Sequence, residues 1–266
     1  MNTTQQRFEG FLNTPVLWKD SEVYYLTQFK IEQELLSFDQ EIDSNQRLGK
    51  YIERFVSHQL VNTEGVNLIA ENIQISKDKI TLGELDCLLF KNEKPIHLEV
   101  IYKFYLFDPN KQGLHCWVGP NKKDSLIEKL EKLQQKQLPL LYSKECTAYL
   151  KSISLDVSEI EQQVYFKAQL FVPFLHKASN LDGINSECIA GFYLNSSEVS
   201  QFSESKFYIP SKKDWLMTPT TNLNWKRYDD FIVESNSYHE RDFSPMCWMK
   251  TKNGELHKFF LVWWQS

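Results

Sequence analysis

The feature that most constrains the fold is a pair of apolar runs between residues 83 and 106 that carry charged side chains. One run follows Asp86, and the other contains Glu99 and Lys103. The turn-prone stretch 91–94 separates the runs, which favours two antiparallel strands joined by a tight turn. A sheet that buries these strands must also accommodate their charges, so this segment limits both the fold and its chemistry.

The expected register brings the charges together. If Phe90 faces Pro95 across the turn, Asp86 lies directly opposite Glu99, and Lys103 shares the face of Glu99 because side chains alternate along a strand. Two like charges that face each other cost up to about 1 kcal/mol, and more when they are buried. A divalent cation held by both carboxylates offsets this repulsion. Mg²⁺, or Mn²⁺, suits such hard oxygen ligands, so Asp86 and Glu99 are the predicted metal ligands.

Other acids flank this pair. Apolar residues at helical spacing predict a helix from about Ser44, a candidate cap, to Leu60, and Glu53 lies beside its apolar stripe. Glu84 shares the face of Asp86 and is expected to support a metal ligand or to replace one, unless it only begins the strand. The plainer alternative is that Asp86 and Glu99 form ion pairs with Lys103 or Arg54 at a sheet edge.

The pattern of predicted elements and the content of aromatic residues change near residue 150, which predicts two regions. Residues 1–150 predict an α/β core, with helices over 21–42, 44–60 and about 121–138, strands over 66–75 and in 83–106, and a return to the sheet over 140–150. Residues 151–266 predict a second, aromatic-rich region, mixed α/β or mostly β, packed on the core. Its short strand-like runs are 165–174, 187–194, 206–210, 247–251 and 258–264.

Net charge and the absence of common motifs limit the classes of function that the sequence favours. The net charge of −5 gives no global attraction for nucleic acid, so phosphate binding needs a local basic patch. The best local patch is the lysine-rich stretch 121–136, where Lys122 and Lys123 are candidate phosphate contacts, although a solvated helix face explains most of these lysines. No nucleotide-binding glycine loop, zincin motif or nucleophile elbow is present in the sequence.

The cysteine content and the lack of long apolar runs predict a cytoplasmic protein. The five cysteines are odd in number and form no C-x-x-C pair, which favours reduced packing residues over disulfides or structural zinc. No apolar run is long enough to cross a bilayer and no signal segment is apparent, so no membrane association is expected. Exposed aromatic residues in the second half make a homodimer plausible.

Several stretches carry a family resemblance. "RLGKYIERF", "GELDCLLF", "HLEVIYKFYL", "KLQQKQLPL" and "FYIPSKKDWL" are similar to the signatures of the bacterial domain-of-unknown-function family 1853. That family is placed in the PD-(D/E)XK nuclease superfamily, which has a restriction-endonuclease-like core: a central mixed sheet flanked by helices. The resemblance implies an Mg²⁺-dependent nuclease that acts on DNA or RNA. It assigns catalytic roles to Glu53, Asp86, Glu99 and Lys103.

The chain departs from the superfamily pattern. The lysine stands four residues after Glu99 instead of two, and Ile101 takes the usual place. The even offset keeps Lys103 on the same face but moves it about 7 Å along the strand. A second hypothesis is therefore a non-catalytic nucleic-acid-binding or protein-interaction protein that retains the nuclease-like fold.

Overall fold

The computed structural model describes residues 3–19, 22–32, 36–43, 45–175, 181 and 183–264. It is an α/β protein with a large mixed sheet flanked by helices. The described strands follow the order β1-β2-β3-β5-β6-β9-β8-β7, with β4 beside β3. The helices are α1 (Thr3–Asn13), α2 (Leu48–Val61), α3 (Leu126–Lys132), α4 (Lys144–Ser152) and α5 (Tyr228–His239). The strands are β1 (Val66–Lys77), β2 (Ile80–Lys91), β3 (Lys94–Phe107), β4 (Trp117–Val118), β5 (Glu161–Pro173), β6 (Ile189–Asn195), β7 (Lys206–Tyr208), β8 (Met246–Lys250) and β9 (Leu256–Val262).

The chain forms two compact units. The acidic unit comprises Val16–Tyr102 and Glu128–Lys167, and the aromatic unit comprises Met1–Pro15, Lys103–Ile127 and Ala168–Ser266. Strands β3 and β5 each contribute residues to both units. Because each unit is assembled from separate segments, composition along the chain does not reveal them. The boundary expected near residue 150 stays a prediction.

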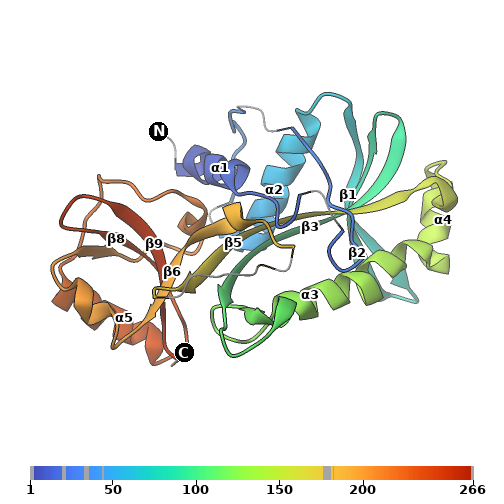
Figure 1. Cartoon of the computed structure of the whole chain (residues 1–266). Coiled ribbons are helices and arrows are strands. Elements are labelled where there is room, and N and C mark those ends of the chain that lie inside the picture. Colours follow the sequence, from blue (N-terminus) through green and yellow to red (C-terminus); the bar gives the residue numbers. More distant parts are fainter. Residues whose placement is uncertain are drawn as a thin grey trace. The chain divides into compact units, whose positions relative to one another are not determined.

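The β2–β3 hairpin has the register expected from the sequence. Phe90 pairs with Pro95 and Leu88 with His97, and the two residues between the strands, Asn92 and Glu93, have positive φ angles of 48° and 68°. Positive φ at both central residues is the geometry of a type I′ turn, whose twist matches that of the flanking strands. Strand β1 pairs antiparallel with β2, and the long β1 and β2 strands lie side by side in Figure 1.

Helix α2 confirms the apolar stripe but begins later than expected. Arg47 is its N-cap residue and provides no side-chain cap, while the predicted cap, Ser44, lies outside the described residues. Tyr51, Ile52 and Phe55 are buried, whereas Glu53 stays partly exposed. The helix therefore buries its apolar face and leaves Glu53 available for polar contacts.

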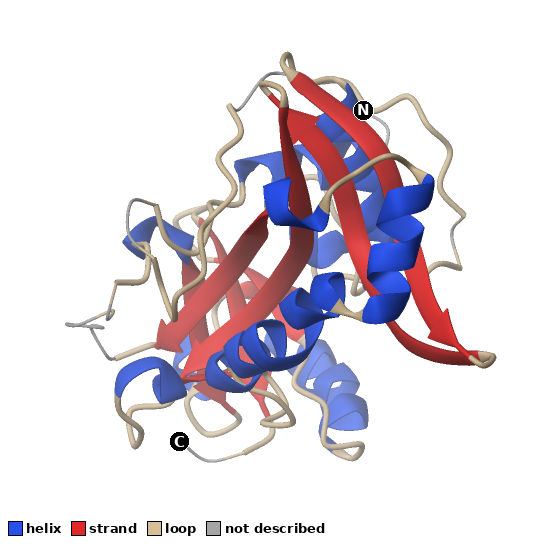
Figure 2. Ribbon diagram, turned by 90° about the vertical axis from the view of Figure 1, so that its right-hand side faces the viewer, coloured by secondary structure: helices blue, strands red, loops and turns tan. Residues whose placement is uncertain are grey.

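The expectation that residues 140–150 return to the sheet is wrong. Helix α3 continues into a π-helical turn (Leu133–Gln137), a 3₁₀ helix (Leu138–Tyr142) and then α4, whose first turn is capped by the hydroxyl of Ser143. These elements cover the acidic unit's part of the sheet in Figure 2. Their buried side chains, Leu141, Cys146 and Leu150, pack against Ile73, Ile75 and Leu85. A short apolar run fits a strand or a buried helix equally well by periodicity, which explains the error.

The helix expected over 21–42 is also wrong for the described residues. Residues 22–32 and 36–43 contain turns and isolated bridges but no helix. Gln28 forms a bridge with Val164, and the backbone N–H of Phe29 donates to the carbonyl of Val164 at 2.8 Å. Leu26 and Phe29 are buried there, so tertiary contacts override local helix propensity. Leu35, which the predicted stripe included, lies outside the described residues.

Strands occur at all five runs expected after residue 151; four lie in the aromatic unit, and the first, β5, contributes residues to both units. Strands β5, β6 and β9 are parallel neighbours, while β9, β8 and β7 are antiparallel. Helix α5, which the sequence did not predict, packs Phe231 against Phe207 with ring centroids 4.4 Å apart. Helix α1 was likewise not predicted. The aromatic residues thus serve largely as core, and the five cysteines are free and buried, as expected for packing residues.

Within the described part of the chain, every helix falls short of the length and apolar character that crossing a membrane requires.

Replacing two helical glycines by alanine is expected to have opposite effects on stability. A Cβ on Gly10 in α1 would lie 2.1 Å from the carbonyl oxygen of Leu216, whereas a Cβ on Gly49 in α2 would meet nothing within 4 Å. Gly10→Ala should therefore destabilise the protein by about 1–3 kcal/mol through the backbone collision. Gly49→Ala should be neutral or stabilising, by up to about 1 kcal/mol. Urea unfolding of both variants checks this, and an unchanged midpoint for Gly10→Ala would contradict it.

Candidate active site

Asp86 interrupts the β2–β3 ladder. Regular pairing reaches Cys87 and Leu98, and one step further along, the backbone N–H of Val100 donates to Oδ2 of Asp86 at 2.8 Å. The carboxylate thus accepts the hydrogen bond of a β3 N–H that a backbone carbonyl would accept in a regular ladder. This contact fixes the Asp86 side chain beside the strand that carries Glu99.

The surroundings of Asp86 disfavour its ionised form. Burial, together with the negative charge of Glu99, raises the pKa of Asp86 to about 7, and Glu53 adds a smaller effect in the same direction. The hydrogen bond from Val100 and the positive charge of Lys129 oppose this rise. The charges of Asp86 and Glu99 therefore interact. That the two carboxylates share one cation stays a prediction.

Glu99 lies at the centre of a buried polar network. Its side chain and that of His97 are fully buried, and His97 Nε2 lies 3.1 Å from Glu99 Oε1. Nε2 of Gln162 donates to Nδ1 of His97 at 3.1 Å and to the carbonyl of Leu138 at 2.6 Å. With Nδ1 accepting, Nε2 carries the proton and donates to Glu99. His97 thus helps to hold the Glu99 carboxylate in place.

A second donor reaches Glu99 from the π-helical turn. Nε2 of Gln137 donates to Glu99 Oε2 at 2.5 Å, and the side-chain oxygen Oε1 of Gln137 accepts from Nζ of Lys129 at 2.7 Å. The turn widens the helix after α3 and brings Gln137 over the strands; such turns are frequent at functional sites. Lys129 is therefore coupled to both acids, through Gln137 to Glu99 and through its charge to Asp86.

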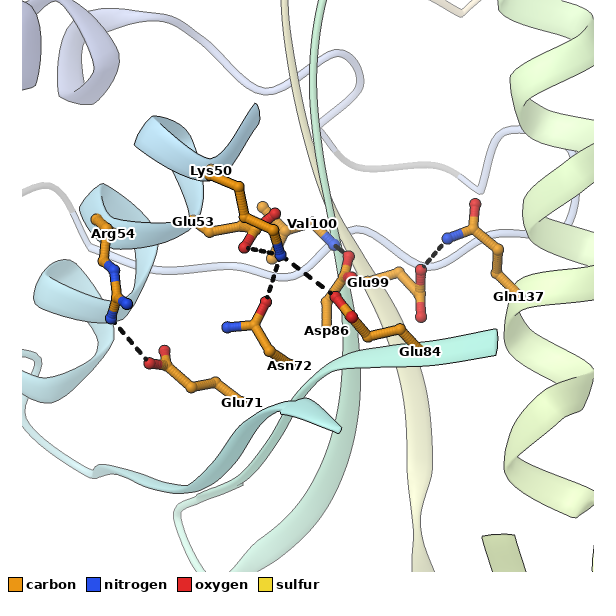
Figure 3. A network of polar contacts seen from close by, with 10 residues as sticks. All are labelled: Lys50, Glu53, Arg54, Glu71, Asn72, Glu84, Asp86, Glu99, Val100 and Gln137. Carbon is orange, nitrogen blue, oxygen red and sulfur yellow. Dashed lines mark hydrogen bonds and ion pairs between the residues drawn. The ribbon is translucent and has the colours of Figure 1, made fainter. Parts of the chain in front are cut away.

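Lys50 organises the acids on the α2 side. Its Nζ lies 2.7 Å from Glu53 Oε2 and 3.6 Å from Glu84 Oε1, and it donates to Asn72 Oδ1 at 3.0 Å. Asn72 has a φ of 54°, a conformation that asparagine tolerates better than most residues. Although partial burial lowers it, the pKa of Lys50 rises overall because Glu53 and Glu84 stabilise the ammonium. Figure 3 shows Lys50, Glu53, Asn72 and Glu84 gathered from α2, β1 and β2 near Asp86, while the carboxylate of Glu99 on β3 is directed toward Gln137.

The basic residues named as alternative ion-pair partners have other contacts. Arg54 lies 3.5 Å from Glu71, and Lys103 lies 2.7 Å from Asp124 within the aromatic unit. The structure thus brings Glu53, Glu84, Asp86 and Glu99 into one unit and assigns Lys103 to the other.

The two candidate phosphate contacts also belong to the aromatic unit. Lys122 and Lys123 are exposed. Nζ of Lys122 lies 3.9 Å from the ring centroid of Trp264 and 3.9 Å from Asp108 Oδ2. Their role in phosphate binding stays a prediction.

Four polar residues at this site were missed from the sequence: Lys50, Asn72, Lys129 and Gln137. Lys50 and Gln137 lie within the stretches that carried the family resemblance, and Lys129 lies in the lysine-rich stretch. Beyond these positions the sequence contained no signal that the residues belong to the site, because one polar residue on a helix does not reveal which strand it faces.

The oxygen donors suit a small divalent cation. The described residues contain no cluster of three or more histidine, cysteine, aspartate or glutamate side chains placed to hold a metal ion. Mg²⁺, however, is commonly held by one or two carboxylates with water and substrate oxygens in its other positions. Asp86 and Glu99 supply two hard donors, and a cation would relieve the repulsion that raises the pKa of Asp86. The residues present therefore fit Mg²⁺ or Mn²⁺.

Fold and side chains together define an α/β protein with a mixed sheet, flanking helices and two interacting acids, Asp86 and Glu99, on the adjacent strands β2 and β3. The family model described as "Domain of unknown function (DUF1853)" matches residues 9–260. The chain belongs to this family, as its sequence signatures indicated. Searches of curated proteins and of solved structures found no match.

Proposed function

We propose that this protein is a metal-dependent phosphodiesterase of the PD-(D/E)XK superfamily that cleaves DNA or RNA. The observation that carries the proposal is geometric: Asp86 on β2 accepts a hydrogen bond from the backbone of Val100 on β3, next to Glu99, and the Glu99 side chain is fully buried. Two acids held this close are costly unless a cation or a proton neutralises them. The restriction-endonuclease-like assignment of the core is part of the same proposal.

Asp86 and Glu99 would hold Mg²⁺ or Mn²⁺. When bound, such an ion supplies Lewis-acid stabilisation of a phosphoryl oxygen and lowers the pKa of a bound water. The protein holds the ligands in place: Val100 fixes Asp86, while His97 and Gln137 fix the two oxygens of Glu99. Preorganised ligands are a requirement for such catalysis.

On the α2 side, Glu53 and Glu84 would orient water or support a ligand, and both acids contact the ammonium of Lys50.

We assign the cation that acts on phosphate to Lys129 in place of Lys103. Lys129 lowers the pKa of Asp86 and contacts the glutamine that binds Glu99. Lys103 instead forms an ion pair with Asp124. A lysine next to the carboxylates can stabilise the negative charge that develops on a phosphoryl group. Lys122 and Lys123 are proposed to contact phosphates of the nucleic acid away from the scissile bond.

A cleavage assay tests this proposal. Single- and double-stranded DNA and RNA are incubated with wild-type protein and Mg²⁺ or Mn²⁺, in parallel with Lys129→Met and Lys103→Met. Lys129→Met should lower the cleavage rate by about 100-fold or more, as for removal of one charge-stabilising donor. Lys103→Met should lower it by less than about tenfold. A larger loss for Lys103→Met would return the role to Lys103, and no cleavage of any substrate with either ion would remove the nuclease proposal.

A second candidate is a non-catalytic binding protein that retains the same fold. One observation favours it: Lys50 and Lys129 already offset part of the acidic charge without a metal. This candidate predicts that calorimetry detects no Mn²⁺ binding to the wild type. The nuclease proposal predicts Mn²⁺ binding that is lost in Glu99→Gln and retained in Glu71→Gln, since Glu71 lies outside the pair and contacts Arg54.

A further inference from the structure

A second candidate site is a cavity of about 370 Å³ whose lining residues all belong to the aromatic unit. Residues from α1, β5, β6 and β9 contribute to it, together with the segment that follows Trp215. Strands β5, β6 and β9 are neighbours in the sheet, in that order. The volume is that of a small-molecule pocket rather than a packing defect.

The cavity contains one lysine with unusual surroundings. Nζ of Lys258 on β9 donates to Oε1 of Gln169 at 2.9 Å and to the backbone carbonyl of Trp215 at 2.9 Å. Gln169 is buried and also donates to the Trp215 carbonyl, which fixes its oxygen toward the lysine. Both acceptors are neutral, and Lys258 forms no ion pair with any carboxylate in the described part of the chain.

This arrangement stabilises an amine rather than an ammonium ion. Burial lowers the pKa of Lys258 to about 7. A neutral amine has two N–H groups and one lone pair. With both N–H groups directed to the two acceptor oxygens, the lone pair remains for a third partner, and Lys258 lines the cavity where such a partner would bind.

Two glycines permit close backbone packing beside the cavity. A Cβ on Gly191 of β6 would lie 2.1 Å from the backbone carbonyl oxygen of Lys258, and one on Gly10 would lie 2.1 Å from that of Leu216. Both glycines line the cavity. The titratable side chains that share its lining are Glu187, Cys188 and His257.

We propose that this cavity binds a small aldehyde or 2-oxo acid and that the amine of Lys258 forms an imine with the carbonyl carbon of this ligand. The lone pair of Nζ attacks the carbonyl carbon and forms a C–N bond, and the carbonyl oxygen becomes a hydroxyl as nitrogen gives up a proton. Loss of that hydroxyl with the second amine hydrogen releases one water and leaves C=N. Nothing is oxidised or reduced, and the site is independent of the acidic unit. Lysines desolvated in this way are known to act as such nucleophiles.

Reductive trapping tests this proposal. Wild-type protein is treated at pH 7 with glyoxylate and cyanoborohydride, and the adduct on each lysine is measured over time by peptide mass spectrometry. Lys258 should react at least about tenfold faster than Lys252, which is exposed and has an ordinary ion-pair partner, because far more of the Lys258 amine is neutral. Its rate should level off as glyoxylate is increased, while that of Lys252 should rise linearly.

A variant of nearly the same shape tests whether the surroundings of Lys258, rather than the general reactivity of lysines, cause its fast trapping. Gln169→Glu places a carboxylate beside Nζ, which should favour the ammonium ion and slow trapping at Lys258 about tenfold, without change at Lys252. Circular dichroism verifies that the variant is folded. Trapping of Lys258 no faster than that of Lys252, or a rate at Lys258 that stays linear with glyoxylate, would overturn the proposal.

Discussion

Asp86→Asn is expected to abolish metal-dependent cleavage and, at the same time, to stabilise the metal-free protein at pH 8. The loss of activity should be about 1,000-fold or more, because an amide is a weak ligand for Mg²⁺ and cannot share a cation with Glu99. The stability effect has the opposite sign because the ionised Asp86 is destabilised by its burial and by Glu99. Asparagine removes that charge and can still accept the hydrogen bond from Val100.

The sign of the pH dependence follows from the raised pKa. A carboxyl group with a pKa of about 7 in the folded state, above its ordinary value of 3.8, binds its proton more tightly when folded. Its contribution to stability is therefore largest below about pH 4 and is lost as the pH rises through about 7. The gain from Asp86→Asn should reach on the order of 2 kcal/mol at pH 8 and shrink toward pH 4.

Thermal unfolding of the two proteins at a series of pH values, with and without Mg²⁺, measures both effects. Mg²⁺ should raise the melting temperature of the wild type at pH 8 and leave that of the variant unchanged. Glu71→Gln, which removes an acid engaged by Arg54, is the matched control and should keep both activity and metal response. If Asp86→Asn cleaved as fast as the wild type, Asp86 would have no role as a ligand.

The central hairpin could be predicted from sequence because its information is local. Two apolar runs and a short turn fix the register up to Cys87 and Leu98, the residues next to Asp86 and Glu99. The stripe of α2 was visible for the same reason. Residues 140–150 failed because a short apolar run does not distinguish a strand from a buried helix, and the difference lies in a long-range contact with β1 and β2.

The polar partners could not be predicted because they depend on tertiary structure. Gln137 reaches Glu99 only through the π-helical turn, and the sequence of that turn does not show it. The sequence favoured Lys103, because its even offset from Glu99 keeps it on the same face of the strand, and it gave no reason to choose Lys129 from the lysine-rich stretch. Only the fold shows that Lys129 acts on Asp86 while Lys103 contacts Asp124.

His97→Leu is expected to cause the largest loss of stability among the site variants. Glu99 is fully buried, and His97 donates to one of its oxygens. Removing this donor leaves a buried carboxylate short of a hydrogen bond, which should cost about 3 kcal/mol. Urea unfolding at pH 7 measures the loss. Lys252→Met, which breaks an ion pair with Glu204 that is exposed on both sides, should cost less than about 0.5 kcal/mol in the same assay.

The double variant His97→Leu/Glu99→Leu shows whether the loss comes from the uncompensated charge. Replacing both partners of a buried pair by apolar residues is often neutral, so the double variant should be more stable than His97→Leu alone even though it carries one more substitution. It should nevertheless be inactive in cleavage, because Glu99 is a proposed metal ligand. A double variant as unstable as the sum of the two single variants would mean that His97 and Glu99 contribute independently, and that the network around Glu99 does not hold the carboxylate as a unit.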